Sequence, residues 1–187
     1  MAKKGWSSKT LALSSDHAWR APKGYVVLVL DRGAAHICIP ATWVVSPGEG
    51  AIDVHDKPPP DDDCVLQIST HRIPIGIDFS GLPVSDLLEG YLNGPQPERN
   101  VLARGEVQTE HRGDLQVSWA ETRFMDEPQN REACSRIALG RRLHVQALIT
   151  LAYWPEDLPR IHPIWATVLQ TLRIAEFVAE PVNHRLH

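Results

Sequence analysis

Apolar and polar residues alternate along much of the second half of this sequence, which is the period of a β-strand with one buried face. The clearest run is 143–154, in which Val145, Ala147, Ile149, Leu151 and Tyr153 fall on one face, and His144, Gln146 and Thr150 on the other. Strands are also predicted at 101–111, 115–124 and 131–139. Because the turns between them are short, we expect these four strands to pair as an antiparallel meander.

The first half of the chain predicts shorter strands. GYVVLVL at 24–30 is rich in β-branched residues, and HICI at 36–39 follows a turn, so the two are predicted to form a hairpin. Further strands are expected at 51–55 and 64–73. The linker at 56–63 holds three consecutive prolines followed by three aspartates, which exclude a helix or a central strand there.

Two stretches instead carry apolar residues at helical spacing. The first follows Pro83, and its apolar face consists of Val84, Leu87, Leu88, Tyr91 and Leu92. Asn93–Gly94 predicts a left-handed stop for this helix. The second has the strongest helical pattern in the chain, formed by Ile161, Ile164, Trp165, Val168, Leu169 and Leu172. With Pro163 in its first turn, this helix is expected to begin at about His162.

These elements predict an α+β fold: an antiparallel β-sheet of about six to eight strands flanked by two main helices. Within it, the segment AHICIPATWVV at 35–45 has a proline inside an apolar run. Pro40 has no N–H to donate, so we expect it to end the strand ladder. Trp43 then has two interpretations, a stacking platform for a ligand or an aromatic side chain that seals the end of the sheet, and the second is favoured.

The order of these elements, together with ICIPATW at 37–43 and VLQTLRI at 168–174, resembles the Mog1/PsbP-like family of α+β domains, including DcrB-type and related bacterial members. That family often carries F-x-I-P-x-x-W near its start and I-L-x-S-F/L-R in its last helix, and this chain departs at the first aromatic and at Thr171–Leu172. The resemblance spans roughly residues 24–175. It implies an antiparallel sheet flanked by helices and mostly non-catalytic roles, but fold alone does not assign a function.

Length and composition fit one ordinary globular domain. The chain has 187 residues, with 43% hydrophobic and 22% charged residues and a formal net charge of -4, so no overall basicity points to a nucleic-acid partner. We expect a polar N-terminal arm at 1–18, a single domain at 19–178 and a C-terminal tail at 179–187. An odd number of separated cysteines, without a secretory signal or a membrane-spanning run, predicts a cytoplasmic protein with no membrane partner.

The acidic linker is one candidate for chemistry. Its carboxylates and imidazole could serve as ligands for a hard cation, and they are Asp53, His55, Asp56, Asp61, Asp62 and Asp63. Their spacing lacks the D-x-D-x-D-G pattern, so a solvated loop is the favoured interpretation. The motifs H-E-x-x-H, G-x-S-x-G and G-x-G-x-x-G are absent, and we therefore expect no catalytic residues and no cofactor.

A polar sheet face is the other candidate. It is predicted to present Gln108, Gln116, Ser118, His144 and Gln146, with Trp43 near the sheet edge. A solvated face remains an alternative. The leading hypothesis is a non-enzymatic binding or adaptor module that uses this face, or an edge cleft near Trp43, for a protein or a small polar ligand. Two alternatives stay open: a metal-dependent protein or enzyme centred on 53–63, and a homodimeric structural protein.

Overall fold

A computed structural model of the chain describes residues 18–74, 76, 78–79, 81–94 and 100–176. The predicted N-terminal arm, apart from Ala18, and the predicted C-terminal tail lie outside these residues. Among the helices described, none has the length and hydropathy needed to cross a membrane.

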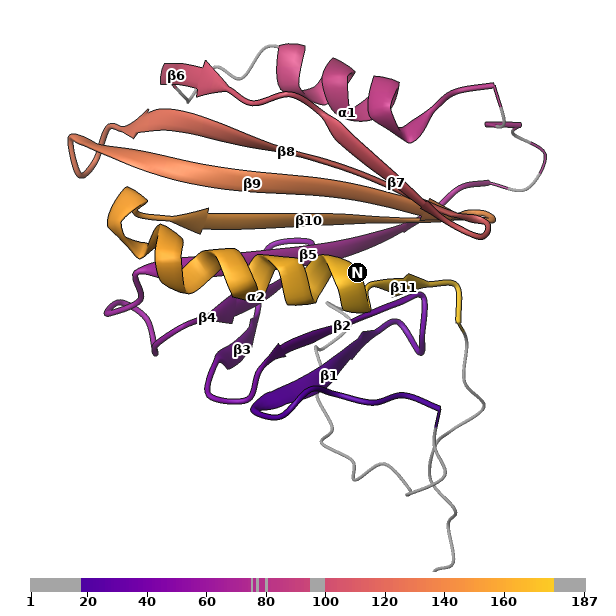
Figure 1. Ribbon diagram of the computed structural model, residues 1–187, viewed down its shortest axis with the longest axis horizontal. Coiled ribbons are helices and arrows are strands. Elements are labelled where there is room, and N and C mark those ends of the chain that lie inside the picture. The colour runs from indigo at the N-terminus through magenta and orange to yellow at the C-terminus, as the bar shows by residue number, and fades with distance from the viewer. Residues whose placement is uncertain (1–17, 75, 77, 80, 95–99, 177–187) are drawn as a thin grey trace, which may run out of the picture.

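Most of the described strands form one large antiparallel sheet of eight (Figure 1). In spatial order its main path is β3 (Val44–Pro47), β4 (Ile52–His55), β5 (Cys64–Arg72), β10 (Val145–Tyr153), β9 (Arg131–Arg142), β8 (Leu115–Asp126) and β6 (Asn100–Arg104). A further strand, β7 (Gln108–Arg112), also pairs with β8. The predicted antiparallel α+β architecture is therefore confirmed.

The first predicted hairpin forms a separate small sheet. It has three strands in the order β1 (Tyr25–Leu30), β2 (Ala35–Pro40) and β11 (Arg173–Ile174), and all its pairings are antiparallel. Pro40 is the last residue of β2, as expected from its missing N–H. The backbone N–H of Trp43 bonds to the Pro40 carbonyl at 3.1 Å, in the turn that takes the chain from the small sheet to the large one.

Two helices complete the fold. Helix α1 (Val84–Asn93) packs on β8 and β9, where its Leu88 and Leu92 join a cluster with Ala120 and Ile137. Helix α2 (Leu158–Thr171) follows a short 3-10 turn, η1 (Pro155–Asp157), and packs against both β2 and β10 (Figure 1). Its buried side chains therefore lie in the main core between the two sheets.

The C-terminal end of α2 is tied to both sheets. Arg112 donates from Nη2 to the Leu169 carbonyl at 2.8 Å and from Nη1 to the Gln170 carbonyl at 2.9 Å. A cation at this position satisfies carbonyls that have no partner inside the helix and complements its dipole. In addition, the Thr171 hydroxyl accepts the Cys38 N–H at 2.9 Å. The last turn of α2 is thereby bonded to β7 in the large sheet and to β2 in the small one.

Three details of the sequence prediction are wrong. Helix α2 begins at Leu158 rather than His162, because Pro159 takes the first-turn position and Pro163 lies inside the helix. Gly94 ends α1 in an extended conformation, with φ -65° and ψ 165°, rather than in a left-handed one. The strand predicted at 101–111 is broken in two: a Cβ on Gly105 would lie 3.2 Å from the Glu121 carbonyl oxygen, and the Gly105 N–H bonds to that oxygen at 2.8 Å.

Candidate functional site

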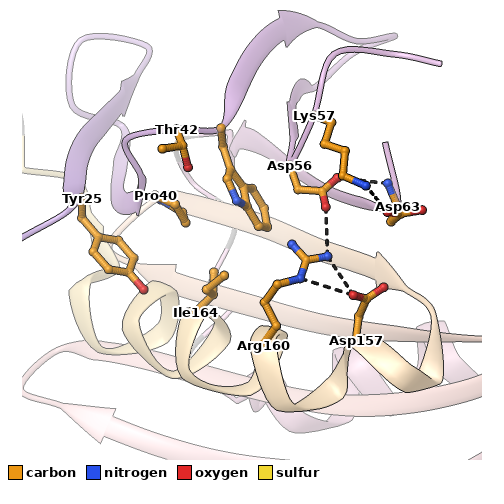
Figure 2. A pocket seen from close by; sticks show the side chains of 10 residues that line it. Tyr25, Pro40, Thr42, Asp56, Lys57, Asp63, Asp157, Arg160 and Ile164 are labelled. Carbon is orange, nitrogen blue, oxygen red and sulfur yellow. Dashed lines mark hydrogen bonds and ion pairs between the residues drawn. The ribbon is translucent and has the colours of Figure 1, made fainter. Parts of the chain in front are cut away.

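A cleft opens where the small sheet, the β4–β5 loop and the start of α2 meet (Figure 2). Its volume is about 470 Å³. It is lined by Tyr25, Pro40, Thr42, Trp43, Asp56, Lys57, Asp63, Asp157, Arg160 and Ile164. The chain brings these residues together from four separate segments, so that no local motif could reveal the set.

One part of the lining is apolar. Trp43 and Ile164 are each 9% exposed, so most of both side chains belongs to the core and only an edge faces the cleft. Tyr25 at the start of β1 and Pro40 at the end of β2 continue this surface. The interpretation of Trp43 as an architectural residue is therefore supported, and the same residue also borders the cleft.

The other part is organised around a buried carboxylate, Asp56, whose side chain is 2% exposed. Its Oδ1 accepts the backbone N–H groups of Asp63 and Cys64 at 3.0 and 3.1 Å. Its Oδ2 lies 2.9 Å from Arg160 Nη2 in an ion pair. A carboxylate this deeply buried is costly unless hydrogen bonds and an opposite charge compensate it, and here both do.

Arg160 joins Asp56 to a second carboxylate. Its Nη2 and Nε lie 3.0 and 3.3 Å from Asp157 Oδ1. The remaining nitrogen, Nη1, points away from both carboxylates (Figure 2), and it has no hydrogen-bond or ion-pair partner among the described residues. The Arg160 side chain lines the cleft and is 41% exposed.

Lys57 and Asp63 form a second, more exposed pair at the rim. Their side chains are 53% and 44% exposed. The hydrogen bond from the Lys57 ammonium holds the pKa of the Asp63 carboxyl below its usual range. The lining as a whole has three carboxylates and two cations, which leaves it with one net negative charge.

The acidic linker is folded into internal contacts. His55 Nδ1 lies 3.0 Å from Asp62 Oδ2, and its Nε2 lies 3.1 Å from the Ser46 hydroxyl. Asp53 Oδ1 accepts from the Gln67 amide at 2.9 Å. Over the part of the chain that the structure describes, no three His, Cys, Asp or Glu side chains are grouped so that they could hold a metal ion. This geometry does not favour the metal-dependent alternative.

The predicted polar face is largely used by the fold. Ser118 is 0% exposed, and its hydroxyl lies 2.9 Å from that of Thr109. Gln116 accepts from Arg141 Nη2 at 2.9 Å. Helix α1 covers the neighbouring part of β8 and β9, so the expectation of an open platform does not hold there.

The grouping of these residues on one face is also wrong. Gln108 pairs with Trp119, and directly paired residues share a face, so Gln108 lies on the opposite side from Ser118. The break at Gly105 sets this register, and it could not be inferred from alternation within 101–111. His144 lies in the turn before β10, where its carbonyl accepts the Ile73 N–H at 2.8 Å, and Gln146 is half-buried in β10.

The functional prediction missed Arg160 and Asp157. They stand three positions apart at the start of a helix, a spacing at which opposite charges form an ion pair. That signal was present in the sequence. The burial of Asp56, in contrast, depends on the packing of α2 against the β4–β5 loop and has no local signal.

A second arginine cluster lies on β8, β9 and β10. Arg136 Nε and the Tyr153 hydroxyl both donate to Glu121 Oε2, each at 2.7 Å. Burial raises the pKa of the Glu121 carboxyl, but these two hydrogen bonds outweigh it and hold that pKa below its usual range. Burial and the bond to Glu121 raise the pKa of Tyr153. Arg136 is 8% exposed, so this cluster is part of the interior rather than an accessible site.

Comparison with solved structures defines the class of fold. The chain is similar to the cyanobacterial PsbP (CyanoP) of Synechocystis sp. PCC 6803, with a TM-score of 0.56 and 12% identity over 87% of this chain and 98% of that one. It is also similar to LpqN, involved in cell envelope biogenesis of Mycobacterium tuberculosis, with a TM-score of 0.52 and 11% identity over 80% and 90% of the two chains. The protein therefore has a PsbP-like α+β fold, which confirms the resemblance to Mog1/PsbP-like domains.

Sequence comparison then gives the family. The chain belongs to the Alr1449 family, whose sequence model matches residues 26–178. Uncharacterized protein alr1449 of Nostoc sp. strain PCC 7120 is 33% identical to it over 177 residues, covering 94% of this chain and 91% of that protein.

Proposed function

We propose that this protein is a non-enzymatic binding module that accepts a short segment of a partner protein in the cleft beside Trp43. The observation that carries the proposal is the Arg160 guanidinium, which is oriented by Asp56 and Asp157 while Nη1 stays accessible. A donor held in place before binding loses little conformational entropy when a ligand arrives.

The chemistry of the lining favours a neutral acceptor. One N–H donor beside an apolar surface suits a backbone carbonyl with an aliphatic or aromatic side chain next to it. The net negative charge of the lining disfavours an anionic ligand. Tryptophan, tyrosine and arginine are also the residue types that contribute most to binding energy at protein interfaces.

The same lining favours binding over catalysis. It contains no histidine or cysteine, and each of its three carboxylates has a cationic partner. A general acid–base pair needs titratable groups with pKa values near the working pH. A small polar ligand is the second candidate, since the volume of about 470 Å³ falls within the usual range for small-molecule sites.

The test is a selection of displayed peptides on the full-length protein, followed by titration calorimetry of the selected sequences. Two variants address the cleft: Arg160→Lys keeps a cation for Asp56 but loses the forked donor, and Thr42→Trp fills the space. We expect both to weaken binding about tenfold or more, which is the effect of losing one charge-assisted hydrogen bond or the apolar contact.

Arg123→Lys is the matched control, because Arg123 is also an exposed arginine paired with a carboxylate, Glu132, but does not line the cleft. It should leave the affinity unchanged. Peptides that bind both cleft variants as tightly as the unmodified protein would show that the segment binds elsewhere. If only small polar compounds, and no peptides, bind in an Arg160-dependent way, the second candidate replaces the first.

A further inference from the structure

Strand β1 is an exposed apolar edge. It lies at the end of the small sheet and pairs only with β2 among the described strands. Its sequence, YVVLVL, contains neither a charge nor a proline, and Val26 and Val29 are 45% and 39% exposed. Sheet edges in monomeric proteins are normally protected by charged side chains, prolines or bulges, because an open edge pairs readily with another strand.

The hydrogen-bond pattern shows which backbone groups face outward. The Ala41 N–H bonds to the Gly24 carbonyl at 2.9 Å, so Gly24 and Ala41 form a hydrogen-bonded pair. In an antiparallel ladder every second pair is hydrogen-bonded, so Val26 and Leu28 also direct their backbone N–H and C=O groups toward β2. The backbone N–H and C=O groups of Tyr25, Val27 and Val29 therefore point away from β2, toward the open edge of the sheet. The Tyr25 N–H bonds to the Pro22 carbonyl at 3.0 Å, whereas the N–H groups of Val27 and Val29 have no backbone partner among the described residues.

We infer that β1 pairs with β1 of a second copy of this chain, antiparallel about a two-fold axis through Val27. Only outward-facing residues can form the hydrogen-bonded pairs between the copies, and this register meets that condition. It sets Val27 opposite its own counterpart and Val29 opposite Tyr25 of the other copy. The N–H groups of Val27 and Val29 in each copy then donate to carbonyls across the interface.

Charge complementarity favours this register, and it favours a second copy of the chain as the partner of β1. Lys23 and Asp31 lie in the turns just outside the two ends of β1, and both are exposed; the Asp31 carboxylate also accepts a hydrogen bond from the Thr70 hydroxyl. Pairing about Val27 sets Lys23 of each copy opposite Asp31 of the other, so both ends of the interface gain an opposite-charge pair. A cross-strand pair of this kind contributes modestly, about 0.2–1 kcal/mol, but like charges at the same place would oppose association.

The side chains on β1 fit the same arrangement. Val29 meets the aromatic ring of Tyr25 across the interface, and Val26 meets Leu28; such aromatic and β-branched pairs favour sheet formation. The two small sheets become one continuous sheet across the dimer. Tyr25 borders both the cleft and this interface, but Val27 and Val29 do not line the cleft, so variants at these two positions test the dimer separately from the proposed ligand.

A cysteine placed on the axis gives the sharpest test. In the full-length protein, Val27→Cys brings two thiols opposite each other with Cα atoms about 5.5 Å apart, a distance that a disulfide spans. Val29→Cys is the matched control, because its thiol faces Tyr25 of the other copy. The native Cys38, Cys64 and Cys134 are all buried and contribute little background. Under mild oxidation, V27C should form the disulfide-linked dimer about tenfold or more faster than V29C. Equal rates for the two variants would contradict the register.

Sedimentation equilibrium tests the interface without a covalent link. The unmodified protein should show a concentration-dependent monomer–dimer equilibrium, and Val27→Pro should be monomeric, because proline removes an outward N–H that the monomer does not use. Lys23→Glu should weaken the dimer, and the double swap Lys23→Glu/Asp31→Lys should restore it. Thermal unfolding checks that each variant is folded. A protein that stays monomeric at all concentrations, or a dimer that survives V27P, would overturn the inference.

Discussion

The two arginine clusters of this protein are built in opposite ways. In the cleft, the arginine is accessible and its carboxylate partner is buried: Arg160 is 41% exposed and Asp56 2%. On the large sheet, the arginine is buried and the carboxylate is more open: the Arg136 side chain is 10% exposed and that of Glu121 is 37%. The two clusters therefore expose opposite charges, a cation in the cleft and a carboxylate on the large sheet.

This difference decides what each cluster can do. A guanidinium with an accessible nitrogen can bind a new acceptor without giving up Asp56 or Asp157. The free nitrogen of Arg136, Nη1, is enclosed in the interior and cannot be reached. The proposed binding role therefore falls to the Arg160 cluster, and we expect the Arg136 cluster to contribute to fold stability. Substitutions that remove one partner at a time test this assignment.

Arg160→Met should have the largest effect on stability. It leaves the Asp56 carboxylate buried without its cation, and an uncompensated buried charge costs about 2–3 kcal/mol even when some hydrogen bonds remain. Urea denaturation followed by tryptophan fluorescence measures the loss. Asp157→Asn is the control, because the ion pair between Arg160 and Asp56 remains in this variant. It should lower the free energy of unfolding much less. A loss for R160M no larger than that for D157N would show that the pair with Asp56 contributes little.

Glu121→Gln should cost less, about 1–2 kcal/mol, because it leaves Arg136 buried beside a neutral amide that can still accept the Tyr153 hydroxyl. The same denaturation experiment measures this loss.

The variant should also change the response to acid. The folded-state pKa of Glu121 lies below its ordinary value of 4.5, so its contribution is present above that pH and is lost as the pH falls through the folded-state pKa. E121Q should lack this part of the acid destabilisation. Parallel stability curves for both proteins below pH 4.5 would contradict the assignment.

Arg136→Met should cost about 1 kcal/mol, less than E121Q, because it removes the more buried charge and leaves the more exposed one, which water can solvate. Comparing the two variants of this cluster measures the asymmetry directly. If R136M is the more damaging of the two, contacts of the Arg136 side chain, which lies 5.6 Å from the Tyr153 ring centre, matter more than its charge.

Lys57→Met should have the smallest effect on stability, because exposed ion pairs are screened by water and contribute little. Differential scanning calorimetry at low and high salt provides the measurement. A Tm that falls by several degrees for K57M would indicate that the rim pair organises the β4–β5 loop.

The sequence predicted the elements of this fold well because their signals are local. Alternation in β10 and the apolar stripe of α2 depend only on neighbouring residues and on burial. The register of β7 could not be predicted from the sequence, because the close approach of Gly105 to Glu121 depends on a strand that comes later in the chain. The residues that line the cleft were predicted only in part: Trp43 stands out as a large ring after a proline, whereas the burial of Asp56 depends on a helix that begins about a hundred residues later.

The way in which Asp56 fastens the β4–β5 loop has a consequence for how much change the loop tolerates. Its carboxylate holds the N–H groups of Asp63 and Cys64, so the two stems of the loop stay together whatever lies between them. Insertions or deletions at 58–61 should therefore leave the cleft intact. The length and composition of this tip can therefore change without loss of the contacts that shape the cleft beneath it.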